Sequence, residues 1–169
     1  MELRVMTVEW AEELVCLLRE NKDRFCPVEP LRPEEYYTAE FHRLWLEKNG
    51  ENTSEIAFGL FEAGRLSGQI KLSVIQRGAS QSAAMGYWVD RASEGRGCCS
   101  WMVSETLRYA RDKLGLHRVW ASVLPENKAS QRVLEKNGFS RFGLSRDHLC
   151  IAGQWRDHLL YEIILPDLT

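Results

Sequence analysis

MGYWVDRASEGRGCC, at residues 85–99, has the pattern of a buried strand that leads into a glycine loop and then into an amphipathic helix. Gly95 and Gly97 let the main chain come close to a ligand, and the first N–H groups of a helix have no intrahelical partners. Such N–H groups point outward and bind anions. The stretch therefore predicts either a phosphate-binding loop or a tight turn between a strand and a helix.

NKASQRVLEKNGF, at residues 127–139, is a second segment that favours the phosphate-binding interpretation. In this order and at this distance, the two segments resemble the GNAT N-acetyltransferase superfamily, and the chain looks like its RimJ/RimL branch. That branch acetylates protein N-termini, including those of ribosomal proteins. The resemblance covers nearly the whole chain. Its other matching segments are Leu3 to Thr7, Glu20-Asn21, Glu29-Pro30, Phe58 to Phe61, Gly86 to Trp88, Glu94 to Gly97 and Gly153 to His158.

The composition favours one soluble domain. The chain has 169 residues, of which 44% are apolar, so we expect one well-packed domain over residues 1–169. Its formal charge is −2 with acidic and basic residues interspersed, which argues against a nucleic-acid partner. The start of the chain lacks the pattern of a leader, and no apolar run reaches membrane-spanning length. We therefore expect a cytoplasmic protein without a membrane partner.

The cysteines predict neither a disulfide framework nor a metal site. Their number is odd and they lack the paired spacing of metal ligands, so we expect reduced thiols and no metal. The five are Cys16, Cys26, Cys98, Cys99 and Cys150. Cys98 and Cys99 fall where a helix N-terminus can lower a thiol pKa, so a nucleophile is conceivable. The alternative is that they are small residues that pack beside a crowded loop.

The first third of the chain predicts a strand and two helices. Residues 3–6 form the strand, and Thr7 caps a helix that ends near Asn21. The proline-rich residues 25–33 form a loop, and a second helix runs from Pro33 to Gly50. The apolar face of this second helix is expected to carry Tyr37, Phe41, Leu44 and Trp45.

The rest of the chain predicts six strands and two helices. Residues 55–62 and 66–75 form a hairpin, and alternation makes its second strand half-buried, with apolar residues on one face. Those apolar residues are Leu66, Ile70, Leu72 and Val74, together with Gly68. The remaining elements are strands over 82–90, 117–124, 139–151 and 155–165, a helix that ends before Gly115, and a short helix that Asn127 caps and Gly138 closes. This order predicts an α/β fold with one central, mostly antiparallel mixed sheet flanked by helices on both faces.

The resemblance implies that acetyl-CoA is the co-substrate and that the strand through Trp88 and Val89 splays from strand 117–124. Unpaired N–H and C=O groups in this gap would receive the pantetheine amides as an added strand does. The pyrophosphate would accept N–H groups of residues 95–99, with Arg96 at the rim. The implied cofactor-binding residues are Trp88, Val89, Asp90, Gly95, Arg96, Gly97, Cys98, Cys99, Asn127 and Ser130. Glu94 stands where the superfamily usually has Gln or Arg, and we expect it to turn to solvent.

Asn127 and Ser130 are three residues apart and therefore share a helix face. By resemblance, Asn127 binds the pantetheine, and Ser130 is catalytic because its hydroxyl serves the departing thiolate. The alternative is that Asn127 is only an N-cap and Ser130 the third residue of its helix. A strand N–H near Trp88 or Val89 would bind the thioester carbonyl, a contact worth a few kcal/mol.

The general base is not evident from the sequence. Some relatives have a Glu in the penultimate strand, but the matching position here is Leu149, next to His148 and two residues after Asp147. An α-amine costs roughly 1 kcal/mol to deprotonate at neutral pH, whereas a lysine costs about 4 to 5 kcal/mol. A site without a strong base therefore favours an α-amine, and we name Asp147, acting through water, as the second catalytic residue, with a neighbouring carboxylate as the alternative.

The acceptor is the least determined part of the reaction. By resemblance, the first two helices form a wall of the acceptor groove, so Glu29, Tyr36 and Tyr37 are candidate substrate contacts; the alternative is a solvated loop with half-buried aromatics. The leading hypothesis is a protein N-terminal α-amine. A small amine such as a polyamine, an antibiotic or an amino acid remains open, as does a non-catalytic acyl-CoA-binding module. Exposed edge strands would also allow a homodimer.

Overall fold

A seven-stranded sheet in the order β1-β2-β3-β4-β5-β7-β6 runs through the chain, whose computed structural model describes residues 1–51 and 54–166. Its strands are β1 Glu2–Val5, β2 Ile56–Glu62, β3 Arg65–Gln76, β4 Ser82–Val89, β5 Arg118–Val123, β6 Ser140–Ile151 and β7 Gln154–Ile164. Only β4 and β5 are parallel, and every other neighbouring pair is antiparallel. The predicted mostly antiparallel mixed sheet is confirmed.

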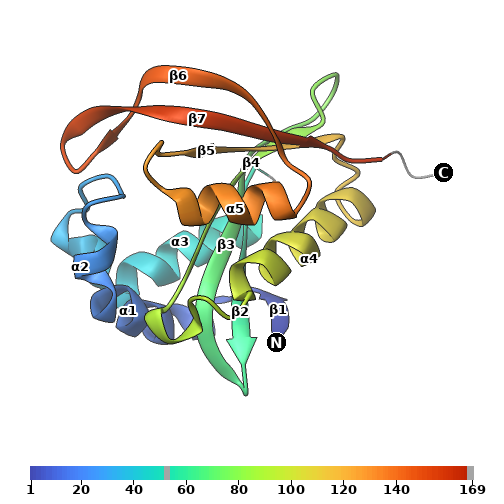
Figure 1. Cartoon of the computed structure of the whole chain (residues 1–169). Coiled ribbons are helices and arrows are strands. Elements are labelled where there is room, and N and C mark those ends of the chain that lie inside the picture. The colour runs from blue at the N-terminus through green and yellow to red at the C-terminus, as the bar shows by residue number, and fades with distance from the viewer. Residues whose placement is uncertain (52–53, 167–169) are drawn as a thin grey trace.

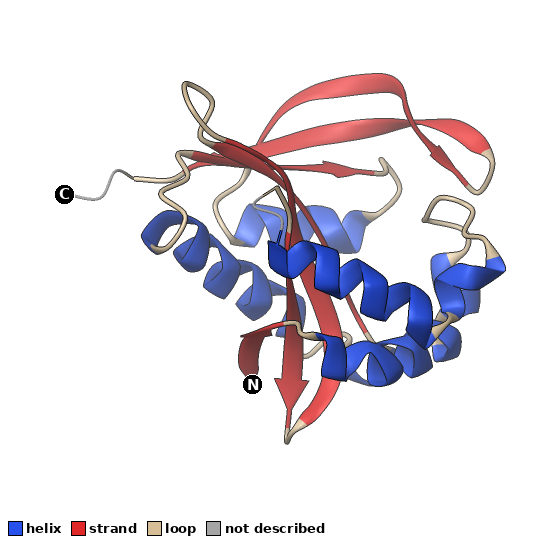
Figure 2. Ribbon diagram, turned by 180° about the vertical axis from the view of Figure 1, so that it is seen from behind, coloured by secondary structure: helices blue, strands red, loops and turns tan. Residues whose placement is uncertain are grey.

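Helices cover both faces of this sheet, with α4 and α5 on one side and α1, α2 and α3 on the other (Figures 1 and 2). Their bounds are α1 Ala11–Glu20, α2 Lys22–Phe25, α3 Ala39–Glu51, α4 Cys98–Asp112 and α5 Lys128–Lys136. Two buried clusters follow from this layering, one between the sheet and α4 and α5, the other between the sheet and α1 and α3. No helix in the described ranges is long and apolar enough to span a membrane.

The N-terminal helices differ from the prediction in their starts. Thr7 does not cap α1, because its hydroxyl bonds Glu9 Oε1 at 2.5 Å and a 3-10 turn over Val8–Trp10 comes first. Pro33 likewise precedes a 3-10 turn, Glu34–Tyr37, rather than the helix itself. The second long helix is α3, and it begins six residues later than Pro33, after Thr38, whose hydroxyl accepts the N–H of Phe41 at 3.3 Å.

This late start changes the buried face of α3. Phe41 and Leu44 were expected in the core but are 39% and 52% exposed, whereas His42 and Leu46 are buried. The prediction counted helical phase from Pro33, and the intervening 3-10 turn shifts that phase. The expected apolar face is therefore wrong at Phe41 and Leu44.

Strand β3 is buried on both faces rather than half-buried. Ser67 and Gln69, expected on a solvent face, are both buried, Ser67 with its hydroxyl on the Leu60 carbonyl at 3.3 Å and Gln69 against the sulfur of Met6 in the N-terminal cluster at 3.2 Å. Val74, expected in the core, is 57% exposed with φ +50°, because the β3–β4 register shifts between Ser73 and Gln76. Single-sequence alternation does not reveal that helices cover the second face of a strand.

The splay that the resemblance implies is present between β4 and β5. The two strands pair at only three positions, Ser82 with Arg118, Ala83 with Val119 and Ala84 with Trp120. Beyond these, β4 continues to Val89 against β3, while β5 continues to Val123 against β7. The central sheet therefore opens into a gap toward the end of β4 that leads to the glycine loop.

Two buried histidines predict that the protein loses stability in mild acid. Burial lowers the pKa of His42 and of His158, so the folded state holds both rings neutral. In the unfolded chain they bind protons near pH 6.5, so this stability is full above about pH 6.5 and is lost as pH falls through the folded pKa values. Urea unfolding from pH 7.5 to 5 should show the loss. Between these pH values the variant H42Q/H158Q should lose less unfolding free energy than the unchanged protein. An equal loss in both proteins would contradict the assignment of the pH dependence to these two histidines.

Candidate functional site

The gap between β4 and β5 is lined by main-chain groups of Tyr87 and Val89. The N–H of Asp90 bonds the carbonyl of Ser67 on β3 at 2.8 Å. Antiparallel pairing alternates along a strand, and the β3–β4 register is unbroken from Val89 back to Ala84. The N–H and C=O groups of Trp88 therefore face β3, and those of Tyr87 and Val89 face the gap.

The side chain of Tyr87 reaches Ser130 across the same gap. Its hydroxyl lies 2.9 Å from Ser130 Oγ and 3.3 Å from the Ser130 carbonyl oxygen. Burial raises the pKa of Tyr87, so the phenol keeps its proton and acts as a donor. When it donates to Oγ, the Ser130 proton is free for a third group. Tyr87 was not a predicted site residue, although it lies in the strand before the glycine loop.

Asn127 is both an N-cap and an available donor. Its Oδ1 accepts the N–H of Ser130 at 3.0 Å, so the capping alternative is correct as far as the oxygen is concerned. The amide NH₂ group is not used by this cap and can donate to a ligand. The two interpretations of Asn127 are thus compatible.

The glycine loop has the conformation that its glycines predict. Gly95 and Gly97 have φ of +68° and +82°, a region that other residues rarely adopt, and a Cβ added to either would meet open space. Gly97 precedes the first residue of α4, Cys98, so the free N–H groups of that helix begin beside the loop. The loop therefore has room for a phosphate next to helix donors.

Charged and polar side chains next to the glycine loop hold its conformation through hydrogen bonds and an ion pair. The carboxylate of Asp90 accepts the N–H of Ser93 at 2.9 Å and so caps the 3-10 turn Arg91–Ser93. Arg96 forms an ion pair with Glu62 at 3.1 Å, and the Ser93 hydroxyl donates to Glu62 at 2.7 Å. Asp90 thus shapes the turn, and Arg96 lies at the rim in an ion pair with Glu62.

The Glu94 side chain is 55% exposed, as expected of a residue that turns to solvent, but it is also held in an ion pair. Its carboxylate accepts a hydrogen bond from the guanidinium of Arg24 on α2, and another nitrogen of the same guanidinium donates to the carbonyl oxygen of Val89. Sequence reasoning missed Arg24, because 65 or more residues separate it from both partners and no motif marks it.

Cys98 and Cys99 should resist alkylation near neutral pH. Burial raises the pKa of Cys98, and it raises that of Cys99 to about 11. A thiolate is the reactive form, and at pH 8 only about one Cys99 in a thousand is ionised. Iodoacetamide followed by mass spectrometry should label the exposed Cys16 and Cys26 first. Labelling of Cys98 or Cys99 at the rate of Cys16 would instead indicate a reactive nucleophile.

Of the predicted acceptor residues, Glu29 lies where the loop after α2 meets the β6–β7 hairpin, and Tyr36 and Tyr37 lie in the 3-10 turn that follows this loop. The Glu29 carbonyl accepts the N–H of Ala152 at 2.9 Å, and Figure 1 shows the hairpin tip above α2. Burial raises the pKa of the Glu29 carboxyl, which the ion pair with Arg32 at 3.7 Å opposes. Burial also raises the pKa of Tyr36 to about 12. Tyr37 is different, because it is buried in the helical core.

Asp147 lies at a bulge of β6. It is exposed, has φ +44°, and its N–H donates to Asp157 Oδ1 at 2.9 Å. The β6–β7 register shifts between Ser145 and Leu149, so the bulge projects these residues out of the ladder. No contact joins Asp147 to Ser130 among the described residues. Any part that Asp147 plays in catalysis therefore runs through water or substrate.

His158 of β7 is a buried imidazole near this bulge. Its Nδ1 lies 2.9 Å from the Arg156 carbonyl oxygen, and its ring centroid lies 5.4 Å from that of His148. Arg156 itself bonds Glu126 at 2.5 Å, just before α5. These contacts tie β7 to the segment that carries Asn127.

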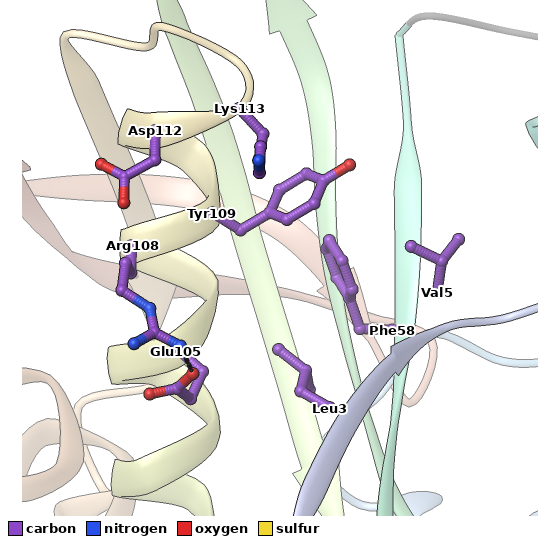
Figure 3. Close-up of a pocket in the computed structure, with 8 residues that line it drawn as sticks. All are labelled: Leu3, Val5, Phe58, Glu105, Arg108, Tyr109, Asp112 and Lys113. Carbon is purple, nitrogen blue, oxygen red and sulfur yellow. Dashed lines mark hydrogen bonds and ion pairs between the residues drawn. The ribbon is translucent and has the colours of Figure 1, made fainter.

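A pocket of about 240 Å³ lies elsewhere, between α4 and strands β1 and β2. Figure 3 shows Tyr109 and Lys113 of α4 on one side and Phe58, Leu3 and Val5 on the other. Tyr109 is eleven residues along α4 from Cys98, or roughly 16 Å at 1.5 Å per residue. This pocket is thus separate from the glycine loop. No cluster of metal-ligating side chains is found over residues 1–51 and 54–166.

Comparison with protein families decides the class of the site. Residues 1–140 match the family model described as an acetyltransferase (GNAT) domain. The chain belongs to the GNAT acetyltransferases. This GNAT domain and its named relatives make the protein an N-acetyltransferase.

Two curated relatives of this GNAT protein are N-acetyltransferases. It is 39% identical to a probable N-acetyltransferase, YjcK of Bacillus subtilis, over 98% of this chain and 94% of the relative. It is 30% identical to the [ribosomal protein uS5]-alanine N-acetyltransferase of Escherichia coli, over 89% of this chain and 80% of the relative. The predicted RimJ/RimL-type resemblance is confirmed.

Solved structures agree with the predicted GNAT fold. The ribosomal-protein-S5-alanine acetyltransferase of Vibrio fischeri has a TM-score of 0.94 at 25% identity, covering 99% of this chain and 94% of that one. RimJ of Mycobacterium smegmatis, in complex with CoA-disulfide, has a TM-score of 0.90 at 27% identity, covering 96% and 80%. A variant of a spermidine N-acetyltransferase from Vibrio cholerae, with a TM-score of 0.81 at 22% identity and coverage of 97% and 95%, shows the fold alone.

Proposed function

We propose that the protein transfers the acetyl group of acetyl-CoA to the α-amine of a protein N-terminus, with a ribosomal protein as the acceptor. The observation that carries the proposal is the opening between β4 and β5, where main-chain groups of Tyr87 and Val89 face a gap beside the Ser130 and Tyr87 hydroxyls. The relatives that acetylate the alanine of a ribosomal protein support the choice of acceptor.

The residues around the gap fit acetyl-CoA, which supplies a thioester-activated acetyl group when bound. Tyr87 and Val89 offer strand N–H and C=O groups to the pantetheine amides, and Asn127 offers its free NH₂ group. Gly95 to Cys99 offer helix N–H groups to the phosphates. The N–H of Tyr87 or Val89, rather than that of Trp88, is the donor for the thioester carbonyl.

Ser130 and Tyr87 serve the leaving group. As the amine nitrogen bonds the acetyl carbon and the carbon–sulfur bond breaks, Ser130 Oγ gives its proton to the sulfur, and it takes a proton back from solvent before the next turnover. Tyr87 donates to Oγ at 2.9 Å and thereby stabilises the serine oxygen as its proton leaves. Because burial keeps Tyr87 protonated, the relay works across the neutral pH range.

The amine loses its proton on the opposite side, through water, to Asp147. The exposed carboxylate at the β6 bulge can accept this proton. A strong base is not required, because deprotonating an α-amine at neutral pH costs only about 1 kcal/mol. Glu29 and Tyr36 form the wall of the acceptor groove. Asp147→Asn should therefore lower turnover and move its pH profile upward; an unchanged rate and profile would exclude Asp147.

The acceptor is tested by release of free CoA thiol from acetyl-CoA with three matched substrates. The first is a peptide with a free N-terminal alanine, the second is the same peptide blocked at its N-terminus but carrying a lysine, and the third is spermidine. We expect turnover with the first alone. Turnover with spermidine alone would assign a small amine, and thermal stabilisation by acetyl-CoA without turnover on any substrate would indicate a binding module.

A further inference from the structure

Arg24 joins α2 to the glycine loop and to the coenzyme gap. One guanidinium nitrogen donates to the Glu94 carboxylate at the head of the loop, and another donates to the Val89 carbonyl oxygen, which faces the gap. The Arg24 charge also reaches the first turn of α4, since it lowers the pKa of the Cys99 thiol against the larger effect of burial. The coenzyme gap, the glycine loop and the first turn of α4 thus meet at one side chain.

Glu94 makes this contact necessary. A carboxylate directly before Gly95 would repel a pyrophosphate bound at the N-terminus of α4, and this repulsion would weaken coenzyme binding. The nearby Arg96 is already paired with Glu62. The Arg24 side chain is only partly exposed and forms an ion pair with Glu94. It therefore offsets the negative charge that Glu94 would otherwise place beside a bound pyrophosphate.

We propose that Arg24 is a coenzyme-binding residue that supplies, from α2, the positive charge that offsets Glu94 at the head of the glycine loop. In the free protein its guanidinium bridges Glu94 and Val89. When coenzyme binds, the bond to the Val89 carbonyl is released to a pantetheine amide, and the guanidinium stays beside the phosphates while Glu94 holds it there. This inference rests on the proposed use of the gap for acetyl-CoA.

Removing Arg24 should affect the binding of CoA and the binding of pantetheine differently. Arg24→Ala should weaken CoA binding about tenfold, the effect of losing a charge-assisted contact to phosphate. Pantetheine carries the amides but no phosphate, so Arg24→Ala should leave its affinity unchanged or increase it, because the Val89 carbonyl is then free. Calorimetry for CoA and NMR titration for pantetheine give the two dissociation constants.

The controls separate charge from structure. Glu94→Gln in the R24A background should restore only part of the CoA affinity, because it removes the unpaired carboxylate but does not replace the lost contact to phosphate. Arg24→Lys, which keeps the charge, should bind CoA within about threefold of the unchanged protein. Arg43→Ala, which removes another surface ion pair with Glu12, should change neither ligand. Equal weakening of CoA and pantetheine by R24A, or no weakening of CoA, would overturn the proposal. An unmodified protein that binds no CoA would instead overturn the proposed function itself.

Discussion

Removing both hydroxyls of the Ser130–Tyr87 pair should lower kcat about 10²- to 10³-fold, the lower part of the roughly 10²- to 10⁴-fold range that general acid catalysis contributes. In the variant S130A/Y87F neither side chain can give a proton to the departing sulfur. The two hydroxyls lie 2.9 Å apart beside the gap. The two substitutions remove only these oxygens, so we expect the backbone to stay in place. The CoA dissociation constant should change less than about threefold, because main-chain groups hold the coenzyme.

The single variants should reveal how the two hydroxyls divide the work. S130A should lose most of the activity, and Y87F should lose less, because in our account Tyr87 acts through Ser130. Their effects should not add, since the two residues act as one unit. Tyr161→Phe is the matched control, because Tyr161 also bonds α5, at Glu135. A double variant that keeps more than a third of its turnover would rule out this pair as the proton donor.

Gly68→Ala should lower the free energy of unfolding by about 2 to 3 kcal/mol, at the upper end of the cost of overpacking. A Cβ on Gly68 would lie 2.7 Å from the Trp88 carbonyl oxygen and 2.9 Å from Val89 Cγ1. The first of these is backbone, so β3 and β4 must separate to relieve the clash. Because Gly68 pairs with Val89 at the edge of the gap, CoA affinity should also fall.

Gly86→Ala is the matched control for this variant. Gly86 lies on β4, opposite Lys71, and an added Cβ there would meet nothing within 4 Å. Its unfolding free energy should stay within about 0.5 kcal/mol, as for substitutions away from packed features. Urea titrations of the two variants measure both values. If G68A and G86A were equally stable, β3 and β4 would not be packed as tightly at Gly68 as the structure has them.

The sequence allowed prediction of the features that depend on local chemistry. Gly95 and Gly97 indicated the loop, Asn127 indicated a cap, and the succession of strands and helices along the chain followed from alternating segments and turns. The burial of Gln69 was not predictable, because it depends on the N-terminal segment, which packs on this face of β3 from more than 60 residues away.

Site residues that come from distant elements were equally hidden. Arg24 is charged and lies in a segment predicted as the end of a helix and a loop, so its bond to Glu94 could not be inferred from spacing. Tyr87 was predicted to lie in a strand of which only the main-chain groups were expected to bind coenzyme. Its hydroxyl has a partner because α5 brings Ser130 to β4. The shifted face of α3 has the same origin, since a 3-10 turn resets helical phase after Pro33.

Amide exchange at four consecutive residues, the last three of β4 and Asp90 after it, tests the central claim most directly. In the free protein, the N–H groups of Tyr87 and Val89 face the gap, whereas those of Trp88 and Asp90 face β3. NMR-detected hydrogen exchange should therefore show Tyr87 and Val89 exchanging fast without ligand and slowing at least about tenfold at saturating CoA, with a smaller change at Trp88 and Asp90. Equal protection of all four amides in the free protein, or no slowing at Tyr87 and Val89 with CoA, would contradict a coenzyme gap between β4 and β5.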